Sequence, residues 1–520
     1  MFSLNSLTEN TISFKQYEEK ILELSKKIGS CTMKEQFEKL DTQIFESMNK
    51  KIFRNKGLRN IDIKTLLAEV NVSRHVYLIN KEELEKIEDK NNIVYILAKQ
   101  RLEKGKKTIY FLDELVQLKG YGKFSAGVVD LMLKYIVNNS YRKTAKIIND
   151  ITGLNISGSA VWNVIQDIAL KIKEKENYEK EQYEEGILKY KNIEKNVIFS
   201  ELDGVYITLQ GKDKKEAIEN YKINNPDVKE IPKGVRKKEI KVISVYEGFL
   251  KVAKGKNKLI NKKVFAQMDN IINIKERSRI YIEKTYNMSK LKMIILNSDG
   301  GTWTKEKSKG IAFYQMDMHH IKDMIARNIR EKEDIEKLYK MLKENKYEEM
   351  LTFAESLKYA YDGEVSEIEK IDKLKEYIDK NKKDFPRYQD SELFKKGKEK
   401  GNWYKNLGTQ EATNYQVITS RMKRRRMSFS KAGADNLSRI LSMVLSYDYK
   451  GIENELNVQT IPVDIKKESE EEIEYQKLLM NKYKYKKAKN SKYNDSFRGT
   501  IPGIEYLRTD EMCKIREIIY

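Results

Sequence analysis

Two aspartates and one glutamate occupy positions where carboxylates could hold metal ions. Asp203 lies inside an apolar, strand-like segment, Asp299 ends another such segment before two glycines, and Glu411 follows Thr409 in the first turn of a helical pattern. A carboxylate on a buried strand is costly unless positive charge pairs with it, and a divalent ion can pair with several carboxylates at once. In two-metal phosphoryl chemistry, one ion prepares the attacking oxygen and the other stabilises the leaving oxygen. The three acids together predict a site for two Mg²⁺ or Mn²⁺ ions.

Asp317 ends a further apolar segment and is followed by His319 and His320. The Asp-x-x-His spacing could place the His320 imidazole beside the metal-bearing carboxylates or let it hydrogen-bond to one of them. It could equally be a helix cap followed by polar residues. Taken singly, Asp299 could start a turn and Glu411 could only stabilise a helix N-terminus. The combination carries the prediction.

A basic run follows the Glu411 pattern, with six positive charges within residues 421–431. Such a cluster fits a surface that binds phosphates near the site, although a solvated basic face is the plainer alternative. The whole chain has 101 Lys and Arg against 79 Asp and Glu, a net charge of +22, which also suits a polyanionic partner. An A- and T-rich genome could produce part of that excess through its codons. We predict nucleic-acid contacts for Arg421, Lys423, Arg424, Arg425 and Arg426.

Residues 125–172 have the pattern of three helices, the second and third beginning at Ser140 and Ser157, with a turn at Gly153 between them. This pattern predicts a helix-turn-helix. Apolar residues of the third helix repeat at core-facing spacing, which leaves Ser159, Asn163 and Gln166 nearer the solvent face, where a recognition helix contacts base edges. A plain three-helix bundle remains the alternative.

Other segments indicate the elements that must position these residues. Three strand-like segments at 197–210, 239–252 and 262–269 precede a helical stretch near 270–287 and a further strand at 291–301, giving the order β-β-β-α-β. Residues 12–55 predict one or two amphipathic helices, and strand-like patches at 65–80 and from residue 92 predict a small strand pair. Residues 173–195 are almost wholly polar and predict an exposed helical linker.

Composition limits the class of protein. A chain of 520 residues suggests roughly three or four domains, and 40% hydrophobic residues with 5 prolines suit folded cores with much helix. Two cysteines exclude a disulfide framework and a thiolate zinc cluster. The N-terminal residues lack the pattern of a signal peptide, and no apolar run approaches the ~20 residues that span a bilayer. We expect a soluble, intracellular protein without a membrane partner.

The chain resembles the insertion-sequence transposases of the bacterial ISLre type, which are related to Mutator-like transposases. The matching stretches are 201–206, 297–303, 317–320 and 420–435. The resemblance covers most of the chain and implies that Asp203, Asp299 and Glu411 are the DDE acids of a ribonuclease-H-like fold. It implies that Asp317 and His320 accompany them. The family often has Trp where Phe429 stands.

The implied fold class is an α/β ribonuclease-H-like catalytic core with a helical N-terminal DNA-binding region and an all-α insertion, multidomain and mainly helical overall. The expected divisions are a helical region at 1–60, a small strand-containing region at 61–124, the helix-turn-helix-like region at 125–172, the linker at 173–195, the first part of the core at 196–324, the helical insertion at 325–404, the last part of the core at 405–450 and a basic C-terminal region at 451–520.

The implied activity is that of a DNA transposase, which cuts transposon ends and joins them to target DNA by two-metal phosphoryl transfer. Its expected partners are double-stranded DNA, as terminal inverted repeats and target, and further copies of itself in a homodimer or larger assembly. Its expected location is the cytoplasm, associated with the nucleoid. Two alternatives stay open, a non-catalytic helix-turn-helix regulator and a structure-selective ribonuclease-H-like nuclease. Glu201 lies two residues before Asp203 on the same face of a strand, where it could assist Asp203. Glu364 or Glu367 could replace Glu411 as the third acid.

Overall fold

The structure is a computed structural model with two compact units, of which the first spans residues 1–459. It describes residues 13–87, 92–116, 122–253, 256–268, 271–305, 308–361, 363–395, 407–424 and 427–446. The predicted basic C-terminal region at 451–520 therefore lies outside the described residues. None of the helices in these ranges is long and apolar enough to cross a membrane.

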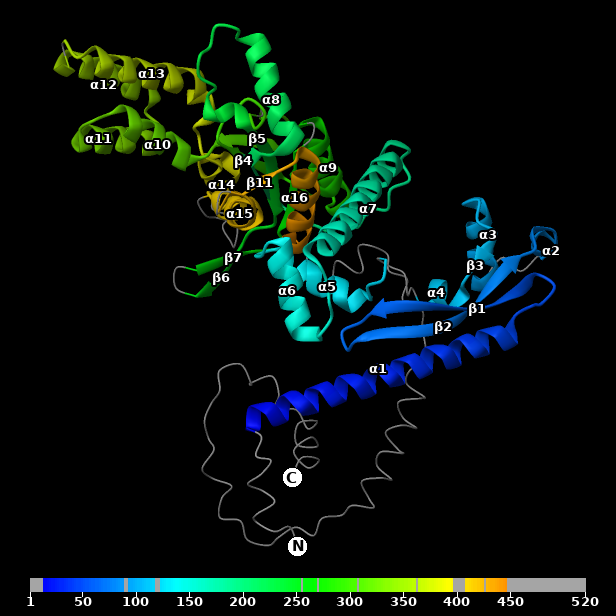
Figure 1. Cartoon of the computed structure of the whole chain (residues 1–520). Coiled ribbons are helices and arrows are strands. Elements are labelled where there is room, and N and C mark those ends of the chain that lie inside the picture. The colour runs from blue at the N-terminus through cyan, green and yellow to red at the C-terminus, as the bar shows by residue number, and fades with distance from the viewer. Residues whose placement is uncertain are drawn as a thin grey trace, which may run out of the picture. The chain divides into compact units, whose positions relative to one another are not determined.

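A six-stranded mixed sheet forms the centre of the chain (Figure 1). Its main path runs β10-β9-β4-β5-β8, and β11 pairs with the end of β4. β4, β5 and β8 are antiparallel neighbours, whereas β9 and β10 run parallel to β4. The strands are β4 (Val197–Leu209), β5 (Lys237–Tyr246), β8 (Lys263–Gln267), β9 (Met293–Ser298), β10 (Ala312–Met316) and β11 (Ser428–Phe429).

The predicted order β-β-β-α-β is confirmed, with α9 (Ile271–Thr285) as the helix before β9. Most of β4 and β5 is buried, as expected for strands that are covered on both faces and read as continuous apolar runs. The segment predicted at 239–252 is more than one strand, because a separate hairpin of β6 (Phe249–Ala253) and β7 (Lys256–Leu259) follows β5.

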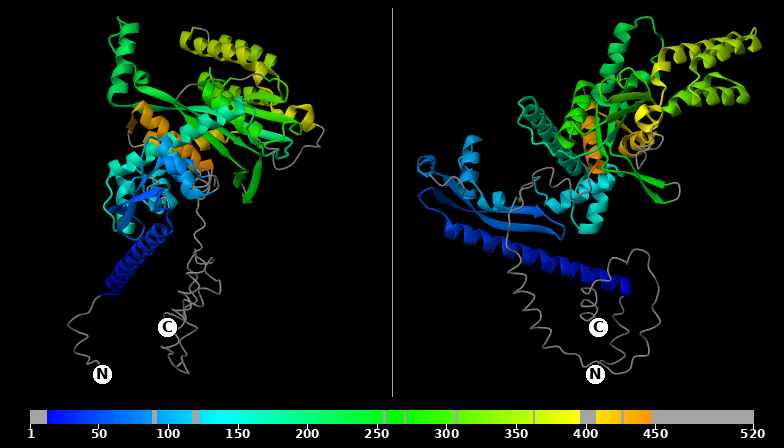
Figure 2. Two further views of the ribbon diagram at one scale, coloured as in Figure 1. Left: turned by 90° about the vertical axis from the view of Figure 1, so that its right-hand side faces the viewer. Right: turned by 180° about the vertical axis from the view of Figure 1, so that it is seen from behind.

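Helices cover both faces of this sheet. On one face, α16 (Lys431–Ser446) packs against alternate strand residues such as Val242 and Val264, in one apolar cluster that also includes the helices of residues 126–184. On the opposite face, α9 packs against the intervening residues Ile243 and Phe265. The period of two along each strand separates these two sets of side chains. Figure 2 shows the layers from two further sides.

The three predicted helices at 125–172 are present as α5 (Ala126–Ile136), α6 (Tyr141–Thr152) and α7 (Gly158–Glu184). The side chains of Ser140 and Ser157 accept amide hydrogen bonds at the starts of α6 and α7. Gly153 ends α6 with φ +77°, a left-handed conformation that glycine adopts at little cost. α7 continues to Glu184, so the third helix and most of the predicted linker are one helix.

A helical block follows β10, as predicted for residues 325–404. It consists of α10 (Met318–Asn328), α11 (Lys332–Lys343), α12 (Tyr347–Leu357) and α13 (Val365–Asn381). These helices bury apolar residues such as Leu338 and Leu374 in one cluster with Met316 of β10. The short helix α14 (Glu392–Lys395) comes next. A further helix, α8 (Gly211–Asn224), buries no residue.

The N-terminal residues form a long helix, α1 (Phe14–Ser47), and an antiparallel hairpin, β1 (Phe53–Lys64) with β2 (Glu69–Ile79), which β3 (Thr108–Ile109) extends. β1 begins inside the range 1–60 that was predicted to be helical, because its largely exposed, polar residues carry no strand pattern and gain their structure by pairing with β2. The short helices α2 (Lys81–Glu85) and α4 (Phe111–Leu115) flank this region.

The strand predicted from residue 92 is wrong. These residues form the helix α3 (Ile93–Glu103), and the Asn92 side chain accepts a hydrogen bond from the Val94 amide at its start. A short apolar run does not distinguish a strand from a buried helix by periodicity, and the polar cap was the signal that favoured the helix.

Candidate active site

Three aspartates occupy equivalent positions on three neighbouring parallel strands. Leu202 of β4 and Met316 of β10 both pair with Ser298 of β9. The next residue along each strand is Asp203, Asp299 or Asp317. The register therefore brings all three acids to one row across β4, β9 and β10, where the carboxyl ends of β9 and β10 meet the middle of β4. Loops at the carboxyl ends of parallel strands are where α/β proteins place their sites.

Asp203 is held by two hydrogen bonds. Its Oδ1 accepts from the Gly204 amide at 2.7 Å, and its Oδ2 accepts from the Asn414 side-chain amide at 2.6 Å. Burial raises the pKa of Asp203 to about 6; the Gly204 amide and His320 lower it, whereas Asp299 and Asp317 raise it. The aspartates thus affect one another electrostatically, as a group of like charges at one site does.

Asp299 starts a turn, which was the plainer of its two explanations. Its Oδ1 accepts from the Gly301 amide at 2.9 Å and from the Thr304 hydroxyl at 2.5 Å. Gly300 has φ +78°, a left-handed conformation that favours glycine, and a Cβ there would have to displace the Met316 methyl group. The turn orients the Asp299 carboxylate in the row of aspartates, and a structural role does not compete with a role in the site.

Asp317 is likewise both a cap and a member of the row. Its Oδ1 accepts from the His319 amide at the start of α10 at 2.8 Å, and its Oδ2 accepts from the Asn297 side chain at 3.2 Å. His320 is exposed in the first turn of α10 and lowers the pKa of Asp203. The structure therefore places the Asp-x-x-His pair beside the first two aspartates.

A second polar row lies two residues before the aspartates and on the same face of each strand. Its members are Glu201, Asn297 and Gln315, which are paired across β4, β9 and β10. The Gln315 side chain donates to Asn297 Oδ1 at 3.1 Å, and Asn297 Nδ2 donates to Glu201 Oε2 at 3.2 Å. All three are buried, so this row is a connected layer of hydrogen bonds beneath the aspartates.

Glu201 anchors the segment that begins the candidate catalytic helix. Its carboxylate accepts from the Tyr246 hydroxyl at 2.6 Å, from the amides of Gly408 and Thr409 at 3.2 Å each, and from the Thr409 hydroxyl. Glu201 is fully buried, and burial raises its pKa. It lies on the face of β4 that also carries Asp203, as the alternation predicts, and it assists by fixing the helix to the strand.

Helix α15 (Gln410–Asn414) presents amides, and not its glutamate, to the sheet. Gln410 is buried and bonds to Ser244 and to the Val242 carbonyl, while Asn414 reaches Asp203. Glu411 is exposed and makes no hydrogen bond or ion pair with any residue that the structure describes. Residues four apart share one face of a helix, and the residue after Gln410 points about 100° away from that face.

The other two candidates for the third acid make contacts inside the helical insertion. Glu364 pairs with Arg330 at 3.4 Å, and Glu367 pairs with Lys370 at 2.7 Å. The charges that shift the pKa of Asp203 are those of Asp299, Asp317 and His320, and neither glutamate is one of them. In this structure the acid in register with Asp203 and Asp299 is Asp317.

The row of aspartates suits divalent ions in the kind of ligand it offers. Carboxylate oxygens are what Mg²⁺ and Mn²⁺ prefer. Within the described residues, none of the three aspartates pairs with a lysine or arginine, and His320 is the neighbouring side chain whose positive charge lowers the pKa of Asp203. The described side chains do not include three His, Cys, Asp or Glu residues that are already close enough to hold one ion. The Asn414 amide, which now contacts Asp203, would have to give way to an ion at that oxygen.

The predicted DNA-contacting residues of the third helix divide into exposed and buried ones. Ser159 and Asn163 are exposed on α7. Gln166 is buried, and its Oε1 accepts from the Asn436 side chain of α16 at 2.6 Å, so the prediction that it faces solvent is wrong. Helical spacing alone could not reveal that α16 covers this side of α7. Trp162 is 44% exposed beside Asn163 and is an additional candidate contact that the sequence analysis did not name.

The basic run is also only partly exposed. A π-helix, η6 (Tyr415–Lys423), continues α15 and contains the start of the basic run. Arg421 in this helix is 2% exposed and donates from Nε to the Ile136 carbonyl at 3.0 Å. The prediction that Arg421 belongs to an exposed phosphate-binding face is therefore wrong. Lys423 and Arg424 are exposed, whereas Arg425 and Arg426 lie outside the described residues.

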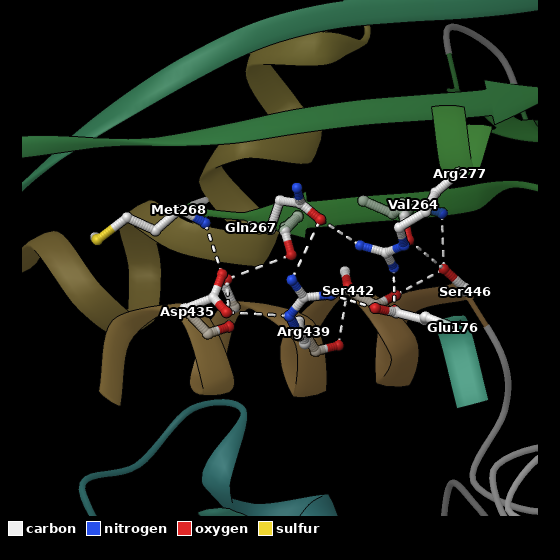
Figure 3. A network of polar contacts seen from close by, with 11 residues as sticks. Glu176, Val264, Gln267, Met268, Arg277, Asp435, Arg439, Ser442 and Ser446 are labelled. Carbon is white, nitrogen blue, oxygen red and sulfur yellow. Dashed lines mark hydrogen bonds and ion pairs between the residues drawn. The ribbon is translucent and has the colours of Figure 1, made fainter. Parts of the chain in front are cut away.

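A partly buried ion-pair network at the β8 edge of the sheet joins α7 to α9 and α16 (Figure 3). Glu176 of α7 pairs with Arg277 of α9 and with Arg439 of α16. Arg439 also contacts Asp435 at 3.2 Å, and both arginines donate to Gln267 of β8, Arg277 at 2.5 Å and Arg439 at 3.3 Å. Burial lowers the pKa of Arg277. Residues that the sequence indicated as a solvated linker are thus attached to the core.

Comparison with known proteins gives one family. The sequence model of an uncharacterised protein family (UPF0236) matches residues 7–222 and 227–457, which together make up most of the chain. No curated protein matches the chain.

Proposed function

We propose that this chain, which belongs to the uncharacterised protein family UPF0236, is a DDE-type DNA transposase of the ISLre type. The row of Asp203, Asp299 and Asp317 across three parallel strands is the observation that carries the proposal. The family is commonly associated with transposase-like proteins, and the sequence motifs resemble the ISLre type. These are independent kinds of support, one geometric and the other from sequence.

A ribonuclease-H-like fold is part of this proposal. The order β10-β9-β4-β5-β8, with an antiparallel β4-β5-β8 unit and two strands added parallel to β4, supports it. In such a core the acids stand on the first strand and at the end of the fourth. Asp203 on β4 and Asp299 after β9 hold these places, and the helical insertion precedes α15 as the resemblance implies.

Two divalent ions, held by Asp203 and Asp299 with a third carboxylate, would supply activation of the attacking oxygen and stabilisation of the leaving oxygen. Asp203 must be ionised to serve as a ligand. The row of Glu201, Asn297 and Gln315 positions the aspartates from below, and Asn414 orients one oxygen of Asp203. We propose Asp317 as the leading candidate for the third carboxylate, with Glu411 as the alternative that the family resemblance implies.

The reaction is hydrolysis of a phosphodiester at a transposon end, which frees a 3′-hydroxyl that then attacks target DNA. Ser159, Asn163 and Trp162 on α7 are the exposed side chains that we propose read the terminal repeats, and Lys423 and Arg424 are those that bind phosphates. Joining two ends requires two copies of the site, so we propose a homodimer or larger assembly.

The test is a cleavage and joining assay with the purified chain, Mg²⁺ or Mn²⁺, and labelled DNA from both sides of its own gene. Wild type is compared with Asp203→Asn, Asp299→Asn, Asp317→Asn and Glu411→Gln. We expect the first three variants to bind the DNA and to lose both cleavage and joining. Loss in Glu411→Gln with activity in Asp317→Asn would return the third position to the glutamate.

Two outcomes would replace the proposal. Cleavage without joining would favour a structure-selective nuclease. DNA binding without any chemistry in wild type, unchanged in Asp203→Asn, would favour a non-catalytic regulator.

A further inference from the structure

A cavity of about 440 Å³ lies between the turn that joins α5 to α6 and the π-helix η6. Val137 and Ser140 line it from the turn, Tyr415, Arg421 and Arg424 line it from η6 and its end, and Met427 closes part of it. The volume lies within the roughly 300–1,000 Å³ that is typical of small-ligand sites.

The charge of this cavity is positive. Its lining contains Arg421 and Arg424 and, among the residues that the structure describes, no acidic side chain. Arg421 is 2% exposed, and among the described residues no carboxylate pairs with it. Its partners are the Ile136 carbonyl, the Met427 sulfur and the rings of Tyr141 and Phe429. Burial accordingly lowers the pKa of Arg421. A buried guanidinium without a counter-ion is costly, and an anion that enters the cavity would offset that cost.

One wall of the cavity carries an aromatic ring beside a guanidinium group. Tyr415 is 40% exposed, and the Arg424 guanidinium lies 4.8 Å from the centre of its ring. Val137, Met427 and Leu445 add apolar contacts. A nucleobase stacks on aromatic rings and on arginine planes, so this wall suits a base as the two guanidinium groups suit its phosphate.

The cavity adjoins the row of aspartates along the backbone. Tyr415 directly follows Asn414, whose side chain bonds to Asp203. Consecutive Cα atoms are about 3.8 Å apart, so the backbone of the cavity's wall begins one residue from a group that contacts the proposed catalytic carboxylate. Helix α15 runs directly on into η6, so one continuous helical segment connects the residue that contacts Asp203 to the wall of the cavity.

We propose that this cavity binds one unpaired nucleotide of the DNA strand next to the cleaved bond, with its phosphate at Arg421 and Arg424 and its base against Tyr415. The proposal rests on the proposed transposase function and names a feature of its substrate, namely a single-stranded nucleotide beside the reacting phosphodiester. It also gives the buried Arg421 a role other than the surface contact that the sequence suggested.

The test measures DNA binding without chemistry. A short fluorescein-labelled oligo-dT strand and a duplex of the same length are titrated with the full chain in EDTA, and binding is followed by fluorescence anisotropy. Tyr415→Leu removes the ring and Arg424→Gln removes the charge at the opening. Lys423→Gln is the matched control, because Lys423 is an exposed cation beside Arg424 that does not line the cavity.

We expect Tyr415→Leu and Arg424→Gln each to weaken single-strand binding by about tenfold and to change duplex binding by no more than Lys423→Gln does. Lys423→Gln should weaken the binding of the single strand and of the duplex slightly and to the same extent. Equal losses in all three variants, or equal losses for the two ligands in Tyr415→Leu, would overturn the proposal, because general attraction to phosphates would then explain the binding.

The cavity and the transposase can fail separately. If wild type shows the expected single-strand preference but cleaves no DNA in Mg²⁺ or Mn²⁺, the cavity stands and the transposase function fails. If wild type cleaves and joins DNA while Tyr415→Leu and Arg424→Gln bind single strands as wild type does, the transposase stands and the cavity proposal fails.

Discussion

Asp203 is the residue at which burial and like charge act most strongly in the row of aspartates. Its pKa is raised to about 6, against about 3.9 in an unfolded chain. Between these values the native protein binds more protons than the unfolded protein, so stability falls as the pH rises through this window. Above the window, ionised Asp203 costs the metal-free protein up to about 3 kcal/mol.

We therefore predict that Asp203→Asn is more stable relative to wild type near pH 7 than near pH 4, because the variant loses one acceptor for Gly204 or Asn414 at both pH values, whereas it avoids the cost of ionisation only at the higher one. Thermal unfolding in EDTA measures this, with Asp167→Asn, an exposed aspartate on α7, as the control that should be neutral at both values. Mg²⁺ should then stabilise wild type and not the variant. A difference in melting temperature between Asp203→Asn and wild type that is the same near pH 4 and near pH 7 would contradict the electrostatic argument.

The argument for Glu201 differs from that for Asp203, because it rests on the hydrogen bonds that the Glu201 carboxylate accepts and not on a shifted pKa. In Glu201→Gln the side-chain NH₂ would face donors from Tyr246, Asn297, Gly408 or Thr409, so one buried donor would lose its acceptor. We predict a loss of about 1–3 kcal/mol in stability and faster amide hydrogen exchange at the start of α15. Glu333→Gln, an exposed change on α11, should stay within about 0.5 kcal/mol. Unchanged exchange at residues 408–414 would show that Glu201 does not hold this helix.

At the scale of elements, α7 serves two purposes along its length. Its first half carries the exposed Ser159 and Asn163, and its second half enters the ion-pair network through Glu176 (Figure 3). A rigid helix between them would hold the proposed DNA-reading residues in a constant position relative to the sheet. Packing, and not the helix's own polar sequence, stabilises the second half.

Glu176→Gln should be strongly destabilising, because it leaves Arg277 and Arg439 without their shared carboxylate. We predict a loss of about 3 kcal/mol, measured by thermal and urea unfolding. Glu179→Gln, one turn away on the same helix, removes a partly exposed pair with Lys284 and should cost less than about 1 kcal/mol. Similar losses in the two variants would mean that the network contributes no more than a surface pair.

The exposed and buried polar residues of α7 should respond differently to truncation. Asn163→Ala should lower the preference for the terminal repeat over unrelated DNA by about 1–3 kcal/mol while leaving the melting temperature unchanged. Gln166→Ala should lower the melting temperature, because it removes the bond from Asn436, and should leave the preference intact. Competition binding and thermal unfolding of both variants test this, and the reverse assignment would place the recognition surface elsewhere.

At the scale of the whole molecule, the net charge of +22 predicts salt-sensitive DNA binding. Each phosphate that the protein neutralises contributes about −0.9 to the slope of log K against log salt concentration on duplex DNA. Lys423→Gln should make the slope of log K against log salt concentration shallower by about one phosphate contact, that is by about 0.9, without changing the sequence preference. A shallow slope in wild type would mean that the positive charge reflects composition and not a binding surface.

The sequence by itself determined what is local. The order of β4, β5, β8, α9 and β9, the serine caps of α6 and α7, and the places of Asp203 within a strand and of Asp299 and Asp317 at strand ends could be predicted, because each depends on residues within a few positions of one another. Strand periodicity also put Glu201 on the face of Asp203. These features are independent of what packs against them.

Only the tertiary structure decided which of those residues meet. Gln166 and Arg421 have the polar character of surface residues, yet α16 covers the first, and the end of α5 accepts a hydrogen bond from the second. Asn414, and not Glu411, contacts Asp203 because the rotation of α15 is set by the anchoring of its start to Glu201, over two hundred residues earlier in the chain. Helical spacing specifies which residues share a face. The partner of that face depends on long-range packing, which the local periodicity of the sequence does not indicate.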